Sequence, residues 1–314
     1  MARVAVLLCA AVLATPAWGA APAPLLGLKG EQARFETMTG QQTIVGHVIV
    51  GWGQGASWGA PFADDFKSLG QIPMLGLATR RGSAEAITPA QIAAGAGDSY
   101  LIALNAAINA FGKPIYIRPF GEMNGYWNAY CAFTKSDRAK PGHSTKSFRQ
   151  AFARVYLILH GGPAAEIDAK LRKLGMPPLG RDLPSNPAPT TKVIWNPQGF
   201  GDPDIPANSA QAYYPGDAYV DVVGDDLYDI RGKAEWAAAE VLYRAHPKRP
   251  FSFPEWGLWG VDDPDFVKHM GSFVRSHPRV EMLAYFESQP GSIFDLATKP
   301  KSRAAYRTYI TTLA

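Results

Sequence analysis

Two hydrophobic patterns alternate along the chain. Short apolar and β-branched runs, such as Val45–Val50 and Ile72–Ala78, are typical of buried strands. Longer segments in which apolar residues recur every three or four positions, such as Phe148–His160, predict amphipathic helices. The short runs predict eight strands, at 25–28, 45–50, 72–78, 114–120, 192–195, 219–223, 251–257 and 282–286.

The segments between these runs are long enough for helices. Gly95 and Gly97 are expected to interrupt one of them, and residues 131–146 and 176–190 are expected to be loops because they are polar and Pro-rich. Neither an internal repeat nor a linker is present, so the pattern predicts an α/β fold, a single (β/α)8 barrel. Helices are predicted at 31–38, 57–69, 89–111, 148–160, 164–174, 234–246, 265–276 and 301–313.

Composition and charge limit the classes of binding partner that we expect. The chain has 314 residues, a comfortable length for one barrel, and only 18% are charged. Its formal charge of +4 is spread out, without a Lys/Arg block. A nucleic-acid partner is therefore not expected, and a neutral polymer is a better candidate. We expect a monomer.

The N-terminus is typical of a bacterial signal peptide. Arg3 precedes an apolar run at 4–14, and small residues follow at 17–21. The apolar run is too short to span a bilayer, so residues 1–21 predict export and residues 22–314 a secreted or periplasmic domain without a membrane span. Cys131 is then the only cysteine left, which excludes an intrachain disulfide and favours a packed, unreactive thiol.

The richest chemistry lies in the segment 114–130, PIYIRPFGEMNGYWNAY. A buried strand ends there and is followed within ten positions by Arg118, Glu122, Asn124 and Trp127. A carboxylate beside a guanidinium, an amide and an indole at a strand end is typical of a sugar-processing site. The alternative is a surface loop in which Glu122 only pairs with Arg118.

Other predicted strands also end in aromatic and acidic residues, which suit stacking on pyranose rings and contacts to hydroxyl groups. The histidines are scattered without an HxH or HExxH pattern, and no Gly-rich phosphate loop is present, so we expect neither a catalytic metal nor a cofactor. The strand-end residues are Trp52, Arg118, Glu122, Trp195, Asp226, Tyr228, Glu255, Trp256 and Glu287.

Glycoside hydrolysis requires two carboxyl groups, and a retaining mechanism requires them about 5–5.5 Å apart. Glu122 follows the fourth predicted strand and Glu255 lies in the seventh, which places them across the barrel mouth. Asp226 and Glu287 remain as rival carboxylates.

These residues stand in motifs that resemble glycoside hydrolase family 26, whose strand-four motif reads roughly R-P-x-H-E-M-N-G-x-W. The corresponding segment is 118–127, RPFGEMNGYW. Further similar pieces are 193–197 (VIWNP), 213–217 (YYPGD), 224–228 (G-x-D-x-Y) and 254–257 (PEWG). The ordered set extends over most of the chain.

The resemblance implies a retaining (β/α)8 β-glycosidase acting on a polysaccharide or oligosaccharide. It implies that Glu122 is the acid/base and that Glu255 is the nucleophile, with Tyr228 hydrogen-bonded to it. A structural role, in a salt bridge or in packing, remains the alternative for each residue. The implied substrate contacts are Arg118, Asn124, Trp127, Trp195, Asp226, Trp256 and Trp52 together with Tyr228.

One position departs from the motif. The family usually has His immediately before the acid/base, whereas this chain has Gly121. The change removes a hydrogen-bonding group and is expected to open space, so β-mannan, β-1,3-xylan and mixed-linkage β-glucan all remain candidate substrates. A non-catalytic carbohydrate-binding barrel and a transglycosylase acting on exopolysaccharide are the alternative functions.

Overall fold

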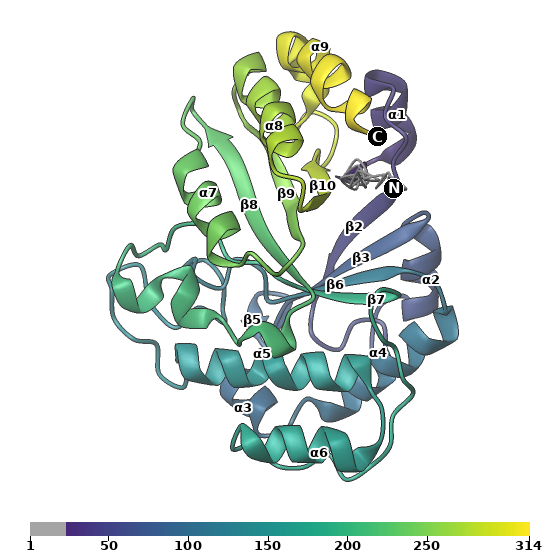
Figure 1. Cartoon of the computed structure of the whole chain (residues 1–314), viewed down its shortest axis with the longest axis vertical. Coiled ribbons are helices and arrows are strands. Elements are labelled where there is room, and N and C mark those ends of the chain that lie inside the picture. The colour runs from purple at the N-terminus through teal and green to yellow at the C-terminus, as the bar shows by residue number, and fades with distance from the viewer. Residues whose placement is uncertain (1–22) are drawn as a thin grey trace, which may run out of the picture.

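A computed structural model describes residues 23–314, and the signal-peptide prediction lies outside these residues. All eight predicted strands are present and close into one parallel barrel in the order β1-β10-β9-β8-β7-β6-β3-β2, which confirms the (β/α)8 prediction (Figure 1). The barrel strands are β1 Leu25–Lys29, β2 Val45–Val50, β3 Ile72–Leu77, β6 Ile115–Pro119, β7 Thr191–Trp195, β8 Val222–Ile230, β9 Phe251–Trp259 and β10 Val280–Phe286.

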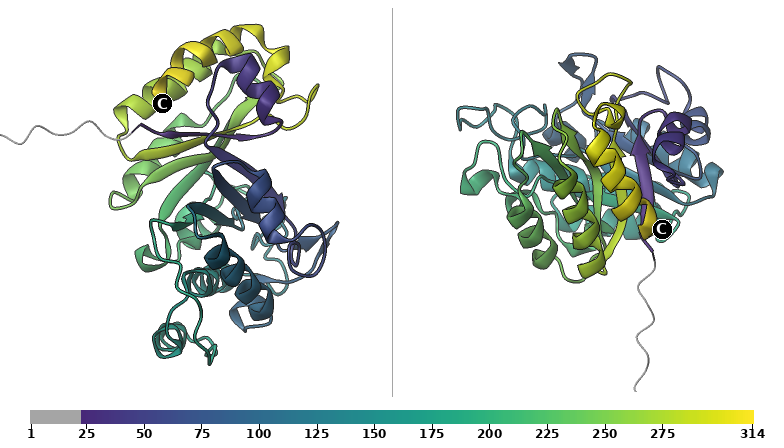
Figure 2. Two further views of the ribbon diagram at one scale, coloured as in Figure 1. Left: turned by 90° about the vertical axis from the view of Figure 1, so that its right-hand side faces the viewer. Right: turned by 90° about the horizontal axis from the view of Figure 1, so that it is seen from above.

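Helices cover the outside of the barrel (Figure 2). The expected interruption near Gly95 is present and separates α3 from α4. No helix in residues 23–314 is long and apolar enough to cross a membrane. The helices are α1 Gln32–Thr39, α2 Phe62–Ser68, α3 Pro89–Ala93, α4 Asp98–Phe111, α5 Thr145–His160, α6 Ala164–Lys173, α7 Trp236–Ala245, α8 Pro264–Ser276 and α9 Pro300–Tyr309.

Two predicted elements have the boundaries that differ most from the structure. The helix predicted from residue 57 begins at Phe62, because Pro61 fixes an extended backbone at the N-cap. The strand predicted at 219–223 begins at Val222 and continues to Ile230, since Asp217–Tyr219 forms a 3₁₀ turn. A two-stranded hairpin, β4 Arg80–Arg81 with β5 Ala84–Glu85, was not predicted.

Two apolar layers hold the barrel together. The larger one lies between strands and helices, and a smaller one fills the lower barrel interior. Tyr116 closes this interior, where its hydroxyl donates to Glu281 over 2.9 Å and Lys192 pairs with the same carboxylate over 2.7 Å. The upper interior is therefore left to polar side chains. The small layer contains Val45, Met74, Tyr116, Ile194, Val222, Met282 and Ala284.

Candidate active site

Arg118 is the centre of the upper barrel interior. Side chains alternate along β6, so that Tyr116 and Arg118 both point into the barrel while Ile117 packs outward. The buried guanidinium donates to Asn196 Oδ1 over 2.5 Å and to Glu255 Oε1 over 2.8 Å, and it also pairs with Asp226. One cation thus joins the ends of β6, β7, β8 and β9.

Glu255 is held by two donors. Its Oε1 accepts from Arg118, and its Oε2 accepts from the Tyr228 hydroxyl over 2.9 Å, which is the contact the sequence predicts. Burial raises the pKa of Glu255, while Arg118 lowers it and Glu122 raises it. Arg118 and Tyr228 therefore favour the ionised carboxylate in a buried position.

Asp226 shares the same guanidinium. It is buried, and burial raises its pKa well above the usual range although Arg118 lowers it. Its second oxygen, Oδ1, has no hydrogen-bond partner among the described residues. Two carboxylates that share one cation repel each other, which favours protonation of one of them. Asp226 is the better candidate for this proton because its Oδ1 is unpaired.

Glu122 reaches the same space from the loop after β6. Phe120 and Glu122 both have φ of 54°, a left-handed conformation that non-glycine residues adopt at a cost of about 1–2 kcal/mol. The Glu122 amide donates to Asn196 O over 2.7 Å, which fixes this turn to the end of β7. The backbone therefore aims Glu122 back over the barrel mouth.

The carboxylate of Glu122 is oriented by two side chains. Trp127 Nε1 donates to Oε2 over 2.7 Å and Gln198 Nε2 donates to Oε1 over 3.0 Å. One oxygen each of Glu122, Asp226 and Glu255 lie within 4.8 Å of one another. Such a trio resembles a metal-binding group, but Arg118 already supplies the positive charge to two of its members.

Two adjoining hollows meet at this pair of glutamates. A pocket of about 110 Å³ lies toward β2 and β3 and is lined by Ile49, Gly76 and Tyr130. A cleft of about 540 Å³ lies toward β8 to β10 and carries exposed aromatic rings, including Trp127 and Trp259. Glu122 and Glu255 line both hollows. The remaining cleft residues are Gln198, Phe200, Asp202, Tyr228, Ile230, Phe286 and Phe294.

His47 in β2 lies close to this chemistry and was not predicted as a site residue. It is buried, both ring nitrogens lack hydrogen-bond partners within residues 23–314, and Nδ1 is 3.8 Å from Glu255 Oε1. Burial, Arg118 and the ammonium of Lys29 lower its pKa well below the usual range, so the imidazole is neutral. No sequence pattern singles it out, because it sits within an apolar strand.

The structure does not bring all predicted residues together. Trp195 and Trp256 are fully buried, so their predicted place in the cleft was wrong. Trp256 packs on Tyr285 and Tyr306, with ring centroids 5.1 and 5.7 Å away, because its neighbour Glu255 points into the barrel. Trp195 packs in the same way on Tyr214, 4.8 Å away.

Three further candidates have supporting roles. Asn124 was predicted to touch substrate, but its amide is used by the backbone, with bonds to Gln198 O, Phe200 O and Gln198 N. Trp52 packs on Tyr100, 4.7 Å between rings, and lines neither hollow. Glu287 accepts from Arg34 and from the Leu296 amide, outside the cleft.

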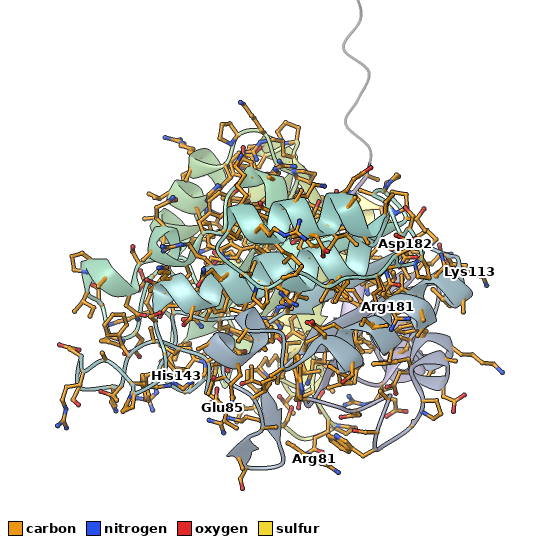
Figure 3. The ribbon with its side chains drawn as sticks, turned by 90° about the horizontal axis from the view of Figure 1, so that it is seen from below. Arg81, Glu85, Lys113, His143, Arg181 and Asp182 are labelled. Atoms are coloured by element: carbon orange, nitrogen blue, oxygen red, sulfur yellow. The ribbon has the colours of Figure 1, made fainter. Side chains whose placement is uncertain are left out.

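The polar segment after residue 131 supports the wall without lining either hollow. His143 lies 3.0 Å from Glu85 of the β4–β5 hairpin (Figure 3). Lys140 donates to Asn128 O over 2.8 Å. Cys131 is buried, as expected of a packed thiol.

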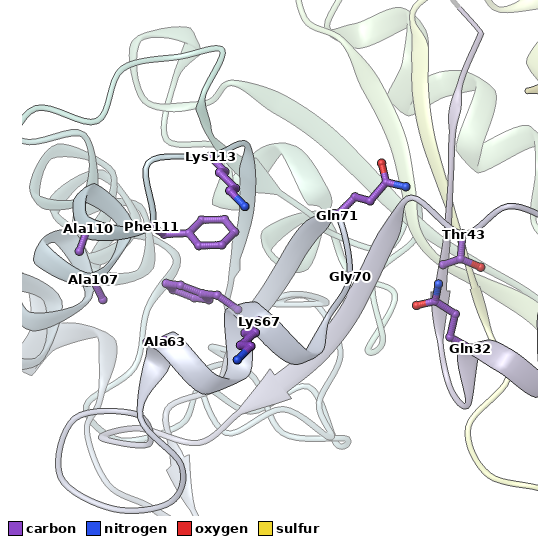
Figure 4. A pocket seen from close by; sticks show the side chains of 11 residues that line it. Gln32, Thr43, Ala63, Lys67, Gly70, Gln71, Ala107, Ala110, Phe111 and Lys113 are labelled. Atoms are coloured by element: carbon purple, nitrogen blue, oxygen red, sulfur yellow. The ribbon is translucent and has the colours of Figure 1, made fainter.

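A larger cavity of about 750 Å³ lies between α2 and α4, where Phe66, Phe111 and Lys113 line it (Figure 4). Gln71 and Lys113 precede β3 and β6, so this cavity is at the N-terminal end of the strands. The described residues that line it include no Asp, Glu, His or Cys. The chemistry therefore collects in the smaller hollows at the opposite end, as is general for barrel enzymes.

No protein-family model matches the chain. Endoglucanase H from Acetivibrio thermocellus is 22% identical over 290 residues, which cover 87% of this chain and 28% of that much longer protein. Among solved structures, a mannanase from Bacillus subtilis aligns with a TM-score of 0.56 and 17% identity, covering 91% of this chain and 85% of that one.

Two further structures carry the family designation GH26. One from a Muricauda species aligns with a TM-score of 0.57 and 15% identity over 92% of this chain and 90% of that one. A β-mannanase from Bacteroides ovatus aligns with a TM-score of 0.54 and 14% identity, covering 90% of this chain and 89% of that one. The resemblance indicated by the sequence motifs is thereby confirmed, and this chain has the barrel fold of glycoside hydrolase family 26 structures.

Proposed function

We propose that this protein is a retaining β-glycanase that hydrolyses a β-linked polysaccharide by double displacement. The observation that carries the proposal is the approach of Glu122 and Glu255, which have one oxygen each within 4.8 Å of the other. This is nearer to the about 5–5.5 Å between the carboxyl groups of a retaining pair than to the wider gap of an inverting pair. The similarity to mannanases and to an endoglucanase supports the same class of reaction.

In the first step, a Glu255 oxygen attacks the anomeric carbon while Glu122 gives its proton to the leaving oxygen, so the glycosidic bond breaks as a glycosyl–enzyme ester forms. In the second step, Glu122 takes a proton from water, which attacks the same carbon and releases Glu255. Arg118 and Tyr228 hold the nucleophile ionised and oriented.

Trp127 and the aromatic cleft are proposed to bind sugar rings beside the cleaved bond. The indole is 39% exposed and also bonds to Glu122, so it couples binding to the position of the acid/base. β-Mannan, β-1,3-xylan and mixed-linkage β-glucan are the proposed substrates to distinguish. Polymers of this kind lie outside the cell, which fits the predicted export.

The test is release of reducing sugar from β-mannan, β-1,3-xylan, β-1,4-xylan and mixed-linkage β-glucan by the wild type, Glu122→Ala and Glu255→Ala. Exposed Glu166 on α6 provides the matched control Glu166→Gln. Release from one polymer, abolished by both alanine variants and unaffected in the control, would support the proposal. Azide should restore turnover to Glu255→Ala, since a small anion can replace the lost nucleophile.

Other outcomes favour the alternatives. A wild type that binds one polymer without cleaving it would favour a non-catalytic carbohydrate-binding barrel. Transfer of glycosyl units to an added acceptor sugar in preference to water would favour a transglycosylase. Products with inverted anomeric configuration, read by NMR, would refute the double displacement.

A further inference from the structure

A second group of carboxylates lies outside the cleft, between the turns that follow β8 and β9. A pocket of about 450 Å³ there is lined by Asp229, Glu235, Asp263 and Asp265. Asp229 faces this pocket because side chains alternate along β8 and its neighbour Tyr228 points to Glu255. Lys233 also lines the pocket, but no ion pair joins it to these acids in the described chain.

Asp229 is the unusual member of this group. It is only 1% exposed, and neither Oδ1 nor Oδ2 has a hydrogen-bond partner among residues 23–314. The amides of Gly232 and Lys233 are near enough to lower its pKa but do not reach hydrogen-bond geometry. Burial of an ionised carboxylate without a partner costs free energy, so this group either pairs with a cation or binds a proton.

Asp263 faces Asp229 from the start of α8. Its Oδ1 is already used as the helix cap, accepting from the amides of Asp265 over 2.9 Å and Phe266 over 3.2 Å. Burial raises the pKa of Asp229, and Asp263 raises it further through a carboxyl–carboxyl hydrogen bond and through its charge, so the two groups are close enough to share either a proton or a cation. Adjacent carboxylate oxygens of this kind are the ligands that a hard cation prefers.

We propose that Asp229 and Asp263 bind a calcium ion in this pocket. Calcium accepts six to eight oxygen ligands in flexible geometry, and the open pocket leaves room for water to complete the set. The ion would fasten the turn after β8 to the start of α8. Ile230 and Trp259 are paired in register beside these turns and line the aromatic cleft, so the site would stabilise one cleft wall.

Terbium luminescence tests the site directly, because Trp236 lines the same pocket and can sensitise a bound lanthanide. We expect saturable terbium binding that calcium displaces and that weakens at least tenfold in Asp229→Asn and in Asp263→Asn. Glu122→Gln and the exposed Asp204→Asn should bind as the wild type does. Calcium at about a hundredfold over its Kd should raise the wild-type Tm by roughly 5 °C.

Three results would overturn the proposal. Absence of saturable terbium binding together with a Tm indifferent to calcium would mean that the two carboxyl groups share a proton. Binding lost in Glu122→Gln would place the ion in the cleft instead. Binding retained in both Asp variants would place it elsewhere. The wild-type titration decides even if Asp229→Asn fails to fold.

Discussion

The guanidinium of Arg118 occupies the place where a side chain on Gly121 would begin. A Cβ atom at residue 121 would lie 2.5 Å from both Cζ and Nη2 of Arg118. Arg118 is bound to Asn196, Asp226 and Glu255 and cannot retreat without breaking these contacts. The buried cation therefore fills the Cβ position of residue 121, while the space expected beside this glycine is the pocket of about 110 Å³ that Gly121 also lines.

Gly121→Ala is accordingly expected to destabilise the protein by about 1–3 kcal/mol, the usual cost of overpacking a buried site. The measurement is urea unfolding followed by circular dichroism. Gly257→Ala is the matched control, since its Cβ would meet the nearest atom, Phe286 O, at an ordinary 3.4 Å. Equal stability of Gly121→Ala and wild type would mean that Arg118 moves freely.

Arg118→Lys tests the charge network through the pH profile. Arg118 lowers the pKa of Glu255, and the proposed mechanism requires this carboxylate to be ionised, so activity should be lost as pH falls through that pKa. A lysine keeps a charge but cannot reach three partners at once. We expect the acidic limb of kcat/KM to move to higher pH and the maximal activity to fall at least tenfold. An unmoved limb would contradict this role.

The barrel could be predicted because each strand begins in an apolar run, and the side chains of these runs form the two hydrophobic layers. The extent of β8 could not, since Asp226 and Tyr228 interrupt the apolar pattern while the backbone continues as a strand to Ile230. The polar residues at the end of such a strand belong to the site in the barrel mouth. Local hydrophobicity therefore underestimates the length of a strand that ends in a functional site.

The proximity of Glu122 and Glu255 was predictable from their places at strand ends, whereas the directions of their neighbours' side chains depend on strand alternation. If Glu255 points inward, strand alternation sends Trp256 outward, and the same argument applies to Asn196 and Trp195. Gln198 could not have been predicted, because its contact with Glu122 depends on a loop that lies 76 positions away in sequence.

A tryptophan buried outside the barrel and a tryptophan in the cleft should respond differently to substitution. Trp256→Ala removes a fully buried ring and should cost about 3–5 kcal/mol of stability. Trp127→Ala removes a ring that is 39% exposed in the cleft and donates to Glu122, so it should leave Tm nearly unchanged and lower kcat/KM. Thermal unfolding and steady-state kinetics on both variants measure the contrast. A Trp127→Ala variant with normal kinetics would remove this residue from the proposed site.

Asp225 offers a test of a buried carboxyl group that holds its proton. Burial raises its pKa to about 8, although the Gly199 amide, which donates to Oδ1 over 2.8 Å, lowers it. The folded protein therefore keeps a proton that the unfolded chain releases above about pH 4, the usual pKa of Asp. The stability that this group contributes is present at low pH and is lost as pH rises toward 8, by up to roughly 1.4 kcal/mol per pH unit.

Asp225→Asn removes this titration while keeping an oxygen that can accept from Gly199. The Tm of the variant should consequently fall less than that of the wild type between pH 5 and pH 8.5. Asp204→Asn, at an exposed position, should follow the wild-type curve. Parallel curves for Asp225→Asn and wild type would mean that Asp225 is already ionised in the folded protein. Its bond to Gly199 would then resemble the charged contacts of Glu255, and the loop that carries Gln198 would owe its position to a carboxylate rather than to a neutral acid.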